Sequence, residues 1–201
     1  SLTYKFIIFT SPVNPFYSSA LKVKVEDQYV RAAQGGTGEA KCAGNYGAAM
    51  YPTKKAQEEG FHQILWLDAK NHSYLEETGT TNVFVVINNK IITPSLDGTI
   101  LAGITRNSII TLLKDYGMEV EERPISIHEV IEAHQKGELK EMFGAGTAAT
   151  IAKIELFNYL GTKYPLPDLN TWTLAPRILA DLDGIKTGQI EDKFNWMLKI
   201  K

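Results

Sequence analysis

The sequence predicts an α+β fold, because stretches typical of strands and of helices alternate irregularly and hairpin signals interrupt them. A doubly wound parallel sheet would need a regular strand–helix alternation instead. The chain has 201 residues, of which 44% are hydrophobic and 22% are charged. This length and composition are those of a globular protein with one sizeable core.

The N-terminal part predicts two strands. Residues 6–9 are short, apolar and aromatic or β-branched, as in a buried strand. The prolines that follow predict a stiff linker over residues 12–15. Residues 21–25 alternate between apolar and charged side chains, which predicts a half-buried strand.

The middle of the chain predicts a strand and a hairpin. Residues 63–68 indicate the single strand. Residues 83–87 are apolar throughout, so we expect both faces of that strand to be covered. Asn88 and Asn89 then predict a tight turn, since asparagine tolerates left-handed φ angles, and residues 90–93 predict the returning strand.

Two helices are expected in the first 120 residues. The first covers about residues 46–59 and ends at Gly60, and Pro52 should either kink it or lie in its first turn. The clearer one covers residues 104–116, has its apolar side chains on one face and ends at Gly117.

Two more helices are expected further on. Ser126 and Glu129 form a capping box that opens a helix ending near Gly137. Pro176 is expected in the first turn of the last helix. Residues 152–159 fit a helix or a strand, and the prolines at positions 165 and 167 mark a loop.

Composition excludes several classes of function. The formal net charge is −2, and no basic run with interleaved aromatic residues is present, so we expect no nucleic-acid partner. The sequence contains no run of about 18 apolar residues, so we expect no membrane span. The first residues lack a signal-peptide pattern. The single cysteine, Cys42, and the spacing of the four histidines predict neither a disulfide framework nor a metal site. A reducing, cytoplasmic compartment is therefore expected.

The most informative stretch is residues 35–46, where Lys41 lies between two glycine-rich flanks and Tyr46 follows five residues later. A P-loop would need lysine between glycine and serine or threonine, whereas Lys41 lies between Ala40 and Cys42. From these residues alone, Lys41 is either a carbonyl-reactive amine that forms a Schiff base or an ordinary lysine of a surface loop.

Several segments in order resemble the branched-chain amino-acid aminotransferases, which are fold-type IV pyridoxal-phosphate enzymes. The resemblance runs from about Phe6 to the end of the chain. The matching segments, read from the sequence, are GGTGEAKCAGNY (35–46), QILWLD (63–68), ETGTTNVF (77–84), TPSLDG (93–98), ILAGITR (100–106) and FGAGTAA (143–149).

The resemblance implies the large domain of a fold-type IV enzyme, with mixed sheets that form a pseudo-barrel flanked by helices. Residues 1–17 would be the last strand of a smaller domain and the interdomain linker, and residues 18–201 the large cofactor-binding domain. About half of the usual enzyme would then be absent from this chain, including the small-domain arginine that binds the cofactor phosphate. A Cys-x-x-Cys pair of some family members is not matched, since Ala149 and Ala152 stand there.

The resemblance also assigns roles to individual residues. Lys41 would hold pyridoxal 5'-phosphate covalently and act as the catalytic base. Tyr46 would hydrogen-bond the phenolic oxygen of the cofactor. Glu77 would pair with the pyridine nitrogen. Glu76 is adjacent, so the residues alone leave two candidates, and the family motif selects Glu77. Arg31 fits the family pattern as a site-shaping or salt-bridge residue.

Physical chemistry and the resemblance agree on the phosphate site. Ile104 and Thr105 open the clearest helix, where free backbone N–H groups and the helix dipole favour an anion. The resemblance assigns those amides to the cofactor phosphate. It also places Thr147 beside the phosphate and, with Ala148, beside the carboxylate of the substrate. Without the resemblance, residues 144–146 read as a flexible glycine-rich turn.

The expected activity is transamination of leucine, isoleucine or valine with 2-oxoglutarate by a homodimer or larger assembly. Its partners would be small amino acids and 2-oxo acids, without nucleic acid, membrane or metal. A D-amino-acid aminotransferase or an aminodeoxychorismate lyase would share the fold and the cofactor. A cofactor-binding domain without catalytic activity is the third alternative.

Overall fold

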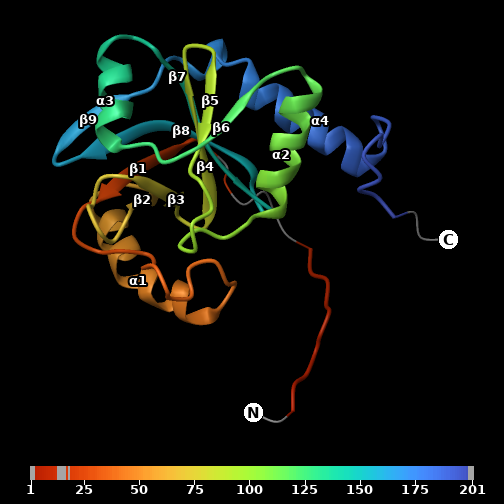
Figure 1. Ribbon diagram of the computed structural model, residues 1–201, viewed down its shortest axis with the longest axis horizontal. Coiled ribbons are helices and arrows are strands. Elements are labelled where there is room, and N and C mark those ends of the chain that lie inside the picture. The colour runs from red at the N-terminus through yellow and green to blue at the C-terminus, as the bar shows by residue number, and fades with distance from the viewer. Residues whose placement is uncertain (1–2, 13–16, 18, 199–201) are drawn as a thin grey trace.

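The computed structural model describes residues 3–12, 17 and 19–198 (Figure 1). The described strands form one mixed sheet of nine strands, and four α-helices lie around its outside. The strands are β1 (Leu21–Glu26), β2 (Gln63–Leu67), β3 (Leu75–Thr78), β4 (Thr81–Ile87), β5 (Lys90–Thr93), β6 (Val120–Glu122), β7 (Leu139–Gly146), β8 (Thr150–Tyr159) and β9 (Thr162–Pro165). The helices are α1 (Ala43–Glu58), α2 (Ile104–Asp115), α3 (Ile127–Gln135) and α4 (Leu174–Thr187), with a short 3-10 turn at Leu169–Thr171. The α+β class is confirmed.

Six of the strands close into a ring. Neighbouring strands follow the order β3-β2-β1-β8-β7-β4, and β4 pairs back onto β3. Strands β5 and β6 continue the sheet from β4, and β9 pairs with β8. Strand β1 runs parallel to both of its neighbours, whereas β7 is antiparallel to both β4 and β8. This mixed, barrel-like sheet agrees with the predicted pseudo-barrel.

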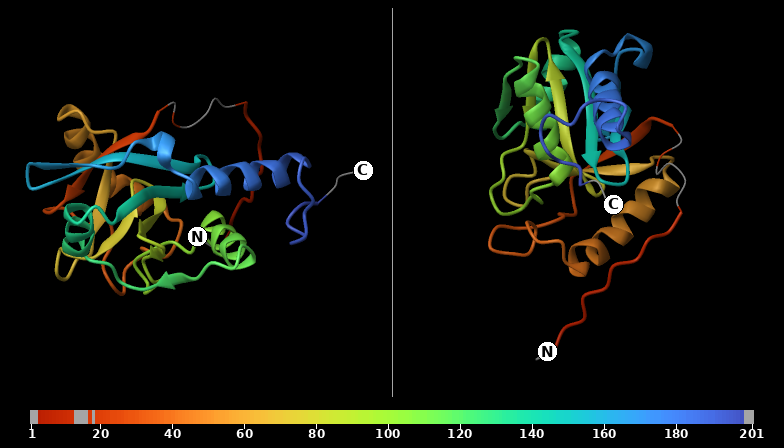
Figure 2. Two further views of the ribbon diagram at one scale, coloured as in Figure 1. Left: turned by 90° about the horizontal axis from the view of Figure 1, so that it is seen from above. Right: turned by 90° about the vertical axis from the view of Figure 1, so that its right-hand side faces the viewer.

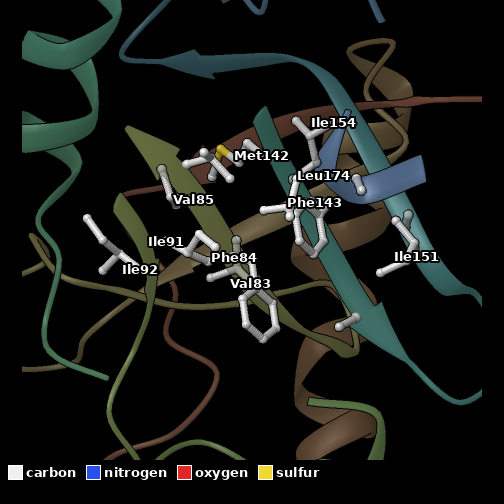
Figure 3. Close-up of a cluster of buried hydrophobic side chains, with 14 of the residues drawn as sticks. Val83, Phe84, Val85, Ile91, Ile92, Met142, Phe143, Ile151, Ile154 and Leu174 are labelled. Atoms are coloured by element: carbon white, nitrogen blue, oxygen red, sulfur yellow. The ribbon is translucent and has the colours of Figure 1, made fainter. Parts of the chain in front are cut away.

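The core lies between the sheet and the helices, and Figure 3 shows its centre on β4, β5, β7 and β8. Phe84 and Phe143 are directly paired across β4 and β7, and their rings stack with centroids 5.3 Å apart. Val83 to Val86 are all buried, which confirms the strand covered on both faces. The Asn88 turn is confirmed as well, with φ of 51°.

The local helix signals agree with the structure. Helix α2 begins at the predicted residue, and Gly117 follows it in the left-handed region with φ of 73°. Helix α3 is opened by the hydroxyl of Ser126, which accepts from the Glu129 amide at 3.0 Å. Pro176 lies in the first turn of α4 as expected. Helix α1 begins at Ala43, so Pro52 is in its interior and not in its first turn.

The N-terminal strand prediction is wrong for this structure. Residues 6–9 are extended without strand pairing and leave the body of the molecule (Figure 2). Their side chains are 71–90% exposed. No described strand lies beside them, and backbone groups that find no partner in a sheet bond to water instead. Of the predicted linker over residues 12–15, residues 13–15 lie outside the described residues.

Other assignments are also corrected. Residues 152–159 belong to β8, which resolves the ambiguity in favour of a strand. Residues 144–146 are the end of β7 and not a flexible turn. A side chain at Gly144 would not fit, because its Cβ would lie 2.3 Å from the hydroxyl oxygen of Thr81. Glycine here therefore allows two strands to pack closely, and it does not indicate a loop.

Within residues 3–12, 17 and 19–198, no helix is both long and apolar enough to cross a membrane. The same residues contain no group of three or more His, Cys, Asp or Glu side chains that could hold a metal ion.

Candidate active site

Lys41 follows a glycine-rich loop that a buried asparagine holds in place. The side-chain amide of Asn45 donates to the carbonyls of Thr37 and Ala40 at 2.7 and 2.8 Å. The Thr37 hydroxyl donates back to the Asn45 carbonyl oxygen at 2.7 Å. The loop therefore has a defined shape although glycine predominates in it.

The Lys41 amine points at the beginning of α1. Its Nζ donates to the hydroxyl of Tyr46 at 3.2 Å, and Tyr46 lies in the first turn of α1. The side chain of Lys41 is exposed, whereas that of Tyr46 is half-buried. The five-residue spacing seen in the sequence thus brings the amine and the phenol into direct contact.

Four of the predicted site residues line one cavity of about 250 Å³. They are Lys41, Ile104, Thr105 and Thr147, which come from the loop before α1, the start of α2 and the turn after β7. The remaining lining residues are Thr80, Asn82, Leu101, Ala102, Gly103, Ala145 and Gly146. Segments far apart in the sequence therefore meet at the end of the sheet where β4 begins and β7 ends.

The start of α2 offers backbone donors to this cavity. Gly103 precedes the helix with extended backbone angles, φ −66° and ψ 134°, and no side chain caps the helix. The first-turn amides of Ile104 and Thr105 have no partner within the helix, and the helix dipole adds about half a positive charge there. A Cβ at Gly103 would lie 2.2 Å from the side-chain oxygen of Asn82, so any larger residue here would displace that side chain.

Glu77 lies behind this cavity and is almost completely buried. Its Oε1 accepts the amide of Leu101 at 2.8 Å, and its Oε2 lies 3.1 Å from Nε of Arg31. The side chains of Arg31 and Glu77 are 6% and 3% exposed. Burial raises the pKa of Glu77, and the charge of Arg31, the Leu101 amide and the charge of Lys41 oppose that rise.

The structure separates the two adjacent glutamates. Successive side chains of a strand point to opposite faces, so Glu76 on β3 faces away from Glu77. Glu76 lines a different cavity of about 550 Å³, together with Asp68, Asp97 and Thr99. Burial raises the pKa of Glu76 to about 7, and the nearby charges of Asp97 and Asp68 also raise it. The Thr99 hydroxyl and the charge of Arg31 act in the opposite direction and lower it. The charge of Lys41 is among the groups that lower the pKa of Glu77.

The turn after β7 contributes one residue to the cavity. Thr147 lines the cavity, but Ala148 is exposed in the same turn and is not among the lining residues. Conversely, the sequence assigned no role to Asn82, whose amide donates to the carbonyl of Leu101 at 2.9 Å. The sequence signal that could have identified Asn82 is its position as a polar residue directly before the apolar run at residues 83–87.

The sequence matches the family described as amino-transferase class IV over residues 1–156. The chain therefore belongs to this family. Branched-chain-amino-acid aminotransferase 2 of Bacillus subtilis (strain 168) is 43% identical over 203 residues, which cover all of this chain and 56% of that relative. A probable branched-chain-amino-acid aminotransferase of Staphylococcus aureus (strain N315) is also 43% identical, over 98% of this chain and 56% of its own length.

Solved structures agree with the fold. The crystal structure of the Escherichia coli branched-chain amino acid aminotransferase matches with a TM-score of 0.74 and 28% identity, over 90% of this chain and 56% of that one. An aminotransferase from Brucella abortus, described as bound to the cofactor PLP, matches with a TM-score of 0.67 and 27% identity, over 84% and 54% of the two chains. The fold-type IV assignment is confirmed, and this chain spans little more than half the length of these relatives.

Proposed function

We propose that this chain is the cofactor-binding portion of a pyridoxal-phosphate-dependent transaminase for leucine, isoleucine and valine, with 2-oxoglutarate as the amino acceptor. The observation that supports this most directly is the shared cavity of Lys41, Ile104, Thr105 and Thr147. The relatives named as branched-chain aminotransferases favour this substrate class over the D-amino-acid and aminodeoxychorismate enzymes. A homodimer or larger assembly stays a prediction.

The residues present fit the cofactor. A carbonyl-reactive amine, a phenol, a buried carboxylate and an uncapped helix start are the groups that pyridoxal phosphate needs. Lys41 would hold it covalently through Nζ, and the amides of Ile104 and Thr105 would hold its phosphate. Tyr46 would hydrogen-bond its phenolic oxygen, and Glu77 would pair with its pyridine nitrogen. The absence of a side chain at Gly103 leaves room for Asn82, whose side-chain oxygen would lie 2.2 Å from a Cβ at this position.

When bound, pyridoxal phosphate supplies an electron sink for the charge that develops at the substrate's α-carbon. The chain's own residues supply the rest. Lys41 accepts and returns a proton at Nζ, which the hydroxyl of Tyr46 orients at 3.2 Å. Glu77 would offer its negative charge to the ring nitrogen, and Arg31 balances the charge of Glu77 inside the protein. Thr147 and the amides of Ile104 and Thr105 would orient the anionic groups of the cofactor and the substrate.

Covalent labelling tests the proposal. A sample loaded with pyridoxal phosphate and reduced with borohydride should carry the cofactor mass on the peptide that contains Lys41. Labelling should be reduced in a Tyr46→Phe variant and abolished in a Lys41→Arg variant, because only Lys41 forms the covalent bond to the cofactor. A label found mainly on Lys54 or Lys70 would refute the assignment of Lys41.

Phosphate alone should bind at the start of α2. Titration with inorganic phosphate, followed by amide chemical shifts, should move Ile104 and Thr105 in a saturable way. The amides at the start of α3 are an internal control, since Ser126 already caps that helix. A Gly103→Ala variant should weaken the response, because its methyl group would displace Asn82. Unchanged Ile104 and Thr105 shifts at high millimolar phosphate would show that this chain does not preform the cradle.

A further inference from the structure

Arg31 is a buried cation that the proposed chemistry does not use directly. It lies in the loop after β1, and its guanidinium contacts three separate segments. Nε lies 3.1 Å from Oε2 of Glu77, Nη1 donates to the carbonyl of Thr99 at 2.6 Å, and Nη2 donates to the carbonyl of Gly38 at 3.2 Å. Nη1 also lies 3.3 Å from the same Gly38 carbonyl. A planar guanidinium with five donors can make this set of contacts, and a lysine ammonium cannot reproduce its geometry.

These contacts join the two loops that supply the site. Gly38 lies three residues before Lys41, and Thr99 lies four residues before Gly103. The loops touch at this point, since a Cβ on Gly38 would lie 2.4 Å from the Thr99 carbonyl oxygen. That oxygen accepts from Arg31, as does the carbonyl of Gly38. A displacement of Arg31 would therefore move both the loop that carries Lys41 and the loop that leads into α2.

Arg31 also acts on the charge of Glu77. A carboxylate that is 3% exposed loses most of its hydration, which disfavours the ionised form. The groups that oppose this effect are Arg31, the amide of Leu101 and the more distant charge of Lys41. Arg31 is the only one of the three that brings a full charge into direct contact with the carboxylate, at 3.1 Å.

We infer that Arg31 is the positioning residue of this site, which keeps Glu77 ionised and ties the Lys41 loop to the loop leading into α2. It acts through Glu77 and the two loops, and it is not among the residues that line the Lys41 cavity. The inference rests on the proposed function for its meaning in catalysis, but the electrostatic part is a property of the chain itself. It can therefore be tested without cofactor.

The test is a carbon-13 NMR titration of the glutamate carboxyl groups in the unloaded chain. The signal of Glu77 is assigned by its loss in a Glu77→Gln variant. In Arg31→Gln, the pKa of Glu77 should rise by about one to three pH units, the usual effect of a neighbouring arginine. In Arg31→Lys, a cation within reach should restore part of that change. The pKa of Glu76 should rise as well, because Arg31 lies within electrostatic reach of it alongside Asp97 and Asp68.

Arg106→Gln is the matched control. Arg106 is also a buried arginine, at 4% exposure, and it pairs with Glu122 at 2.9 Å and with the carbonyl of Pro94 at 3.0 Å. Its loss should leave the titration of Glu77 unchanged. A second readout is the amide signal of Leu101, which donates to Glu77 and should follow the same titration.

An unchanged Glu77 titration in folded Arg31→Gln would overturn the inference. If that variant does not fold, the Arg31→Lys variant decides through the guanidinium contacts. Shifted amide signals in the Gly38 and Thr99 loops together with a partly raised pKa of Glu77 support the inference. Unchanged loop signals together with an unchanged pKa of Glu77 overturn it, because Arg31 would then not be needed to position the site. Labelling of the parent chain separates the two proposals. A shifted Glu77 titration together with no label on Lys41 would retain the role of Arg31 and reject the transaminase assignment.

Discussion

Replacing Lys41 by arginine should abolish the covalent attachment of pyridoxal phosphate and lower transamination of leucine by at least about 10²–10⁴-fold, the usual contribution of a positioned acid–base group. Arginine keeps the positive charge but does not give up its proton, so it can act neither as nucleophile nor as base. The fold should be unaffected, because the side chain is exposed and its described hydrogen bond is the one to Tyr46.

Two measurements check this result: the rate of amino transfer from leucine to 2-oxoglutarate, and the cofactor mass retained after borohydride reduction. The second applies whether or not this chain turns over by itself. Lys54→Arg is the control, since Lys54 is also exposed and lies on α1. Retention of the cofactor at the parental level in Lys41→Arg would contradict the proposed function.

The helices could be predicted because their signals are local. Ser126 and Glu129 cap α3 within one turn, and Gly117 ends α2 in the left-handed conformation that favours glycine. The periodicity that buries one face of α2 is also contained within the helix. Such signals depend on neighbours three or four residues away, so they can be read without knowledge of the fold.

Strand β7 could not be predicted from its own residues. Its end contains Gly144 and Gly146, which indicate a turn when considered alone. Their physical reason is the side chain of Thr81 on β4, which occupies the space that a Cβ would need at either position. The error at residues 6–9 has a related cause, since an apolar segment becomes a strand only where another strand pairs with it.

The candidate site divides in the same way. Lys41 and Tyr46 are close in sequence, and the start of α2 follows from a helix signal, so these could be proposed from the sequence. The choice between Glu76 and Glu77 depends on which face of β3 points to Lys41. The Arg31–Glu77 pair joins a loop to a distant strand, and only the tertiary structure brings these residues together.

Replacing Glu77 by leucine should be the most destabilising change considered. It leaves the buried guanidinium of Arg31 without its counterion and the amide of Leu101 without its acceptor. Removing one partner of a buried ion pair typically costs about 3–5 kcal/mol. For a chain of this size, that corresponds to a fall of roughly 6–20 °C in the thermal unfolding midpoint.

Comparison of variants identifies the cause of that loss. Glu132→Ala also breaks a glutamate ion pair, to Lys136, but both partners are exposed and the unfolding midpoint should hardly change. A double Arg31→Met, Glu77→Leu variant should recover much of the stability lost in Glu77→Leu, because no unpaired charge then remains buried. Thermal or urea unfolding of the four proteins measures these differences. If the double variant is no more stable than Glu77→Leu alone, the penalty does not come from the stranded charge of Arg31, and the loss of packing and of the Leu101 hydrogen bond must account for it.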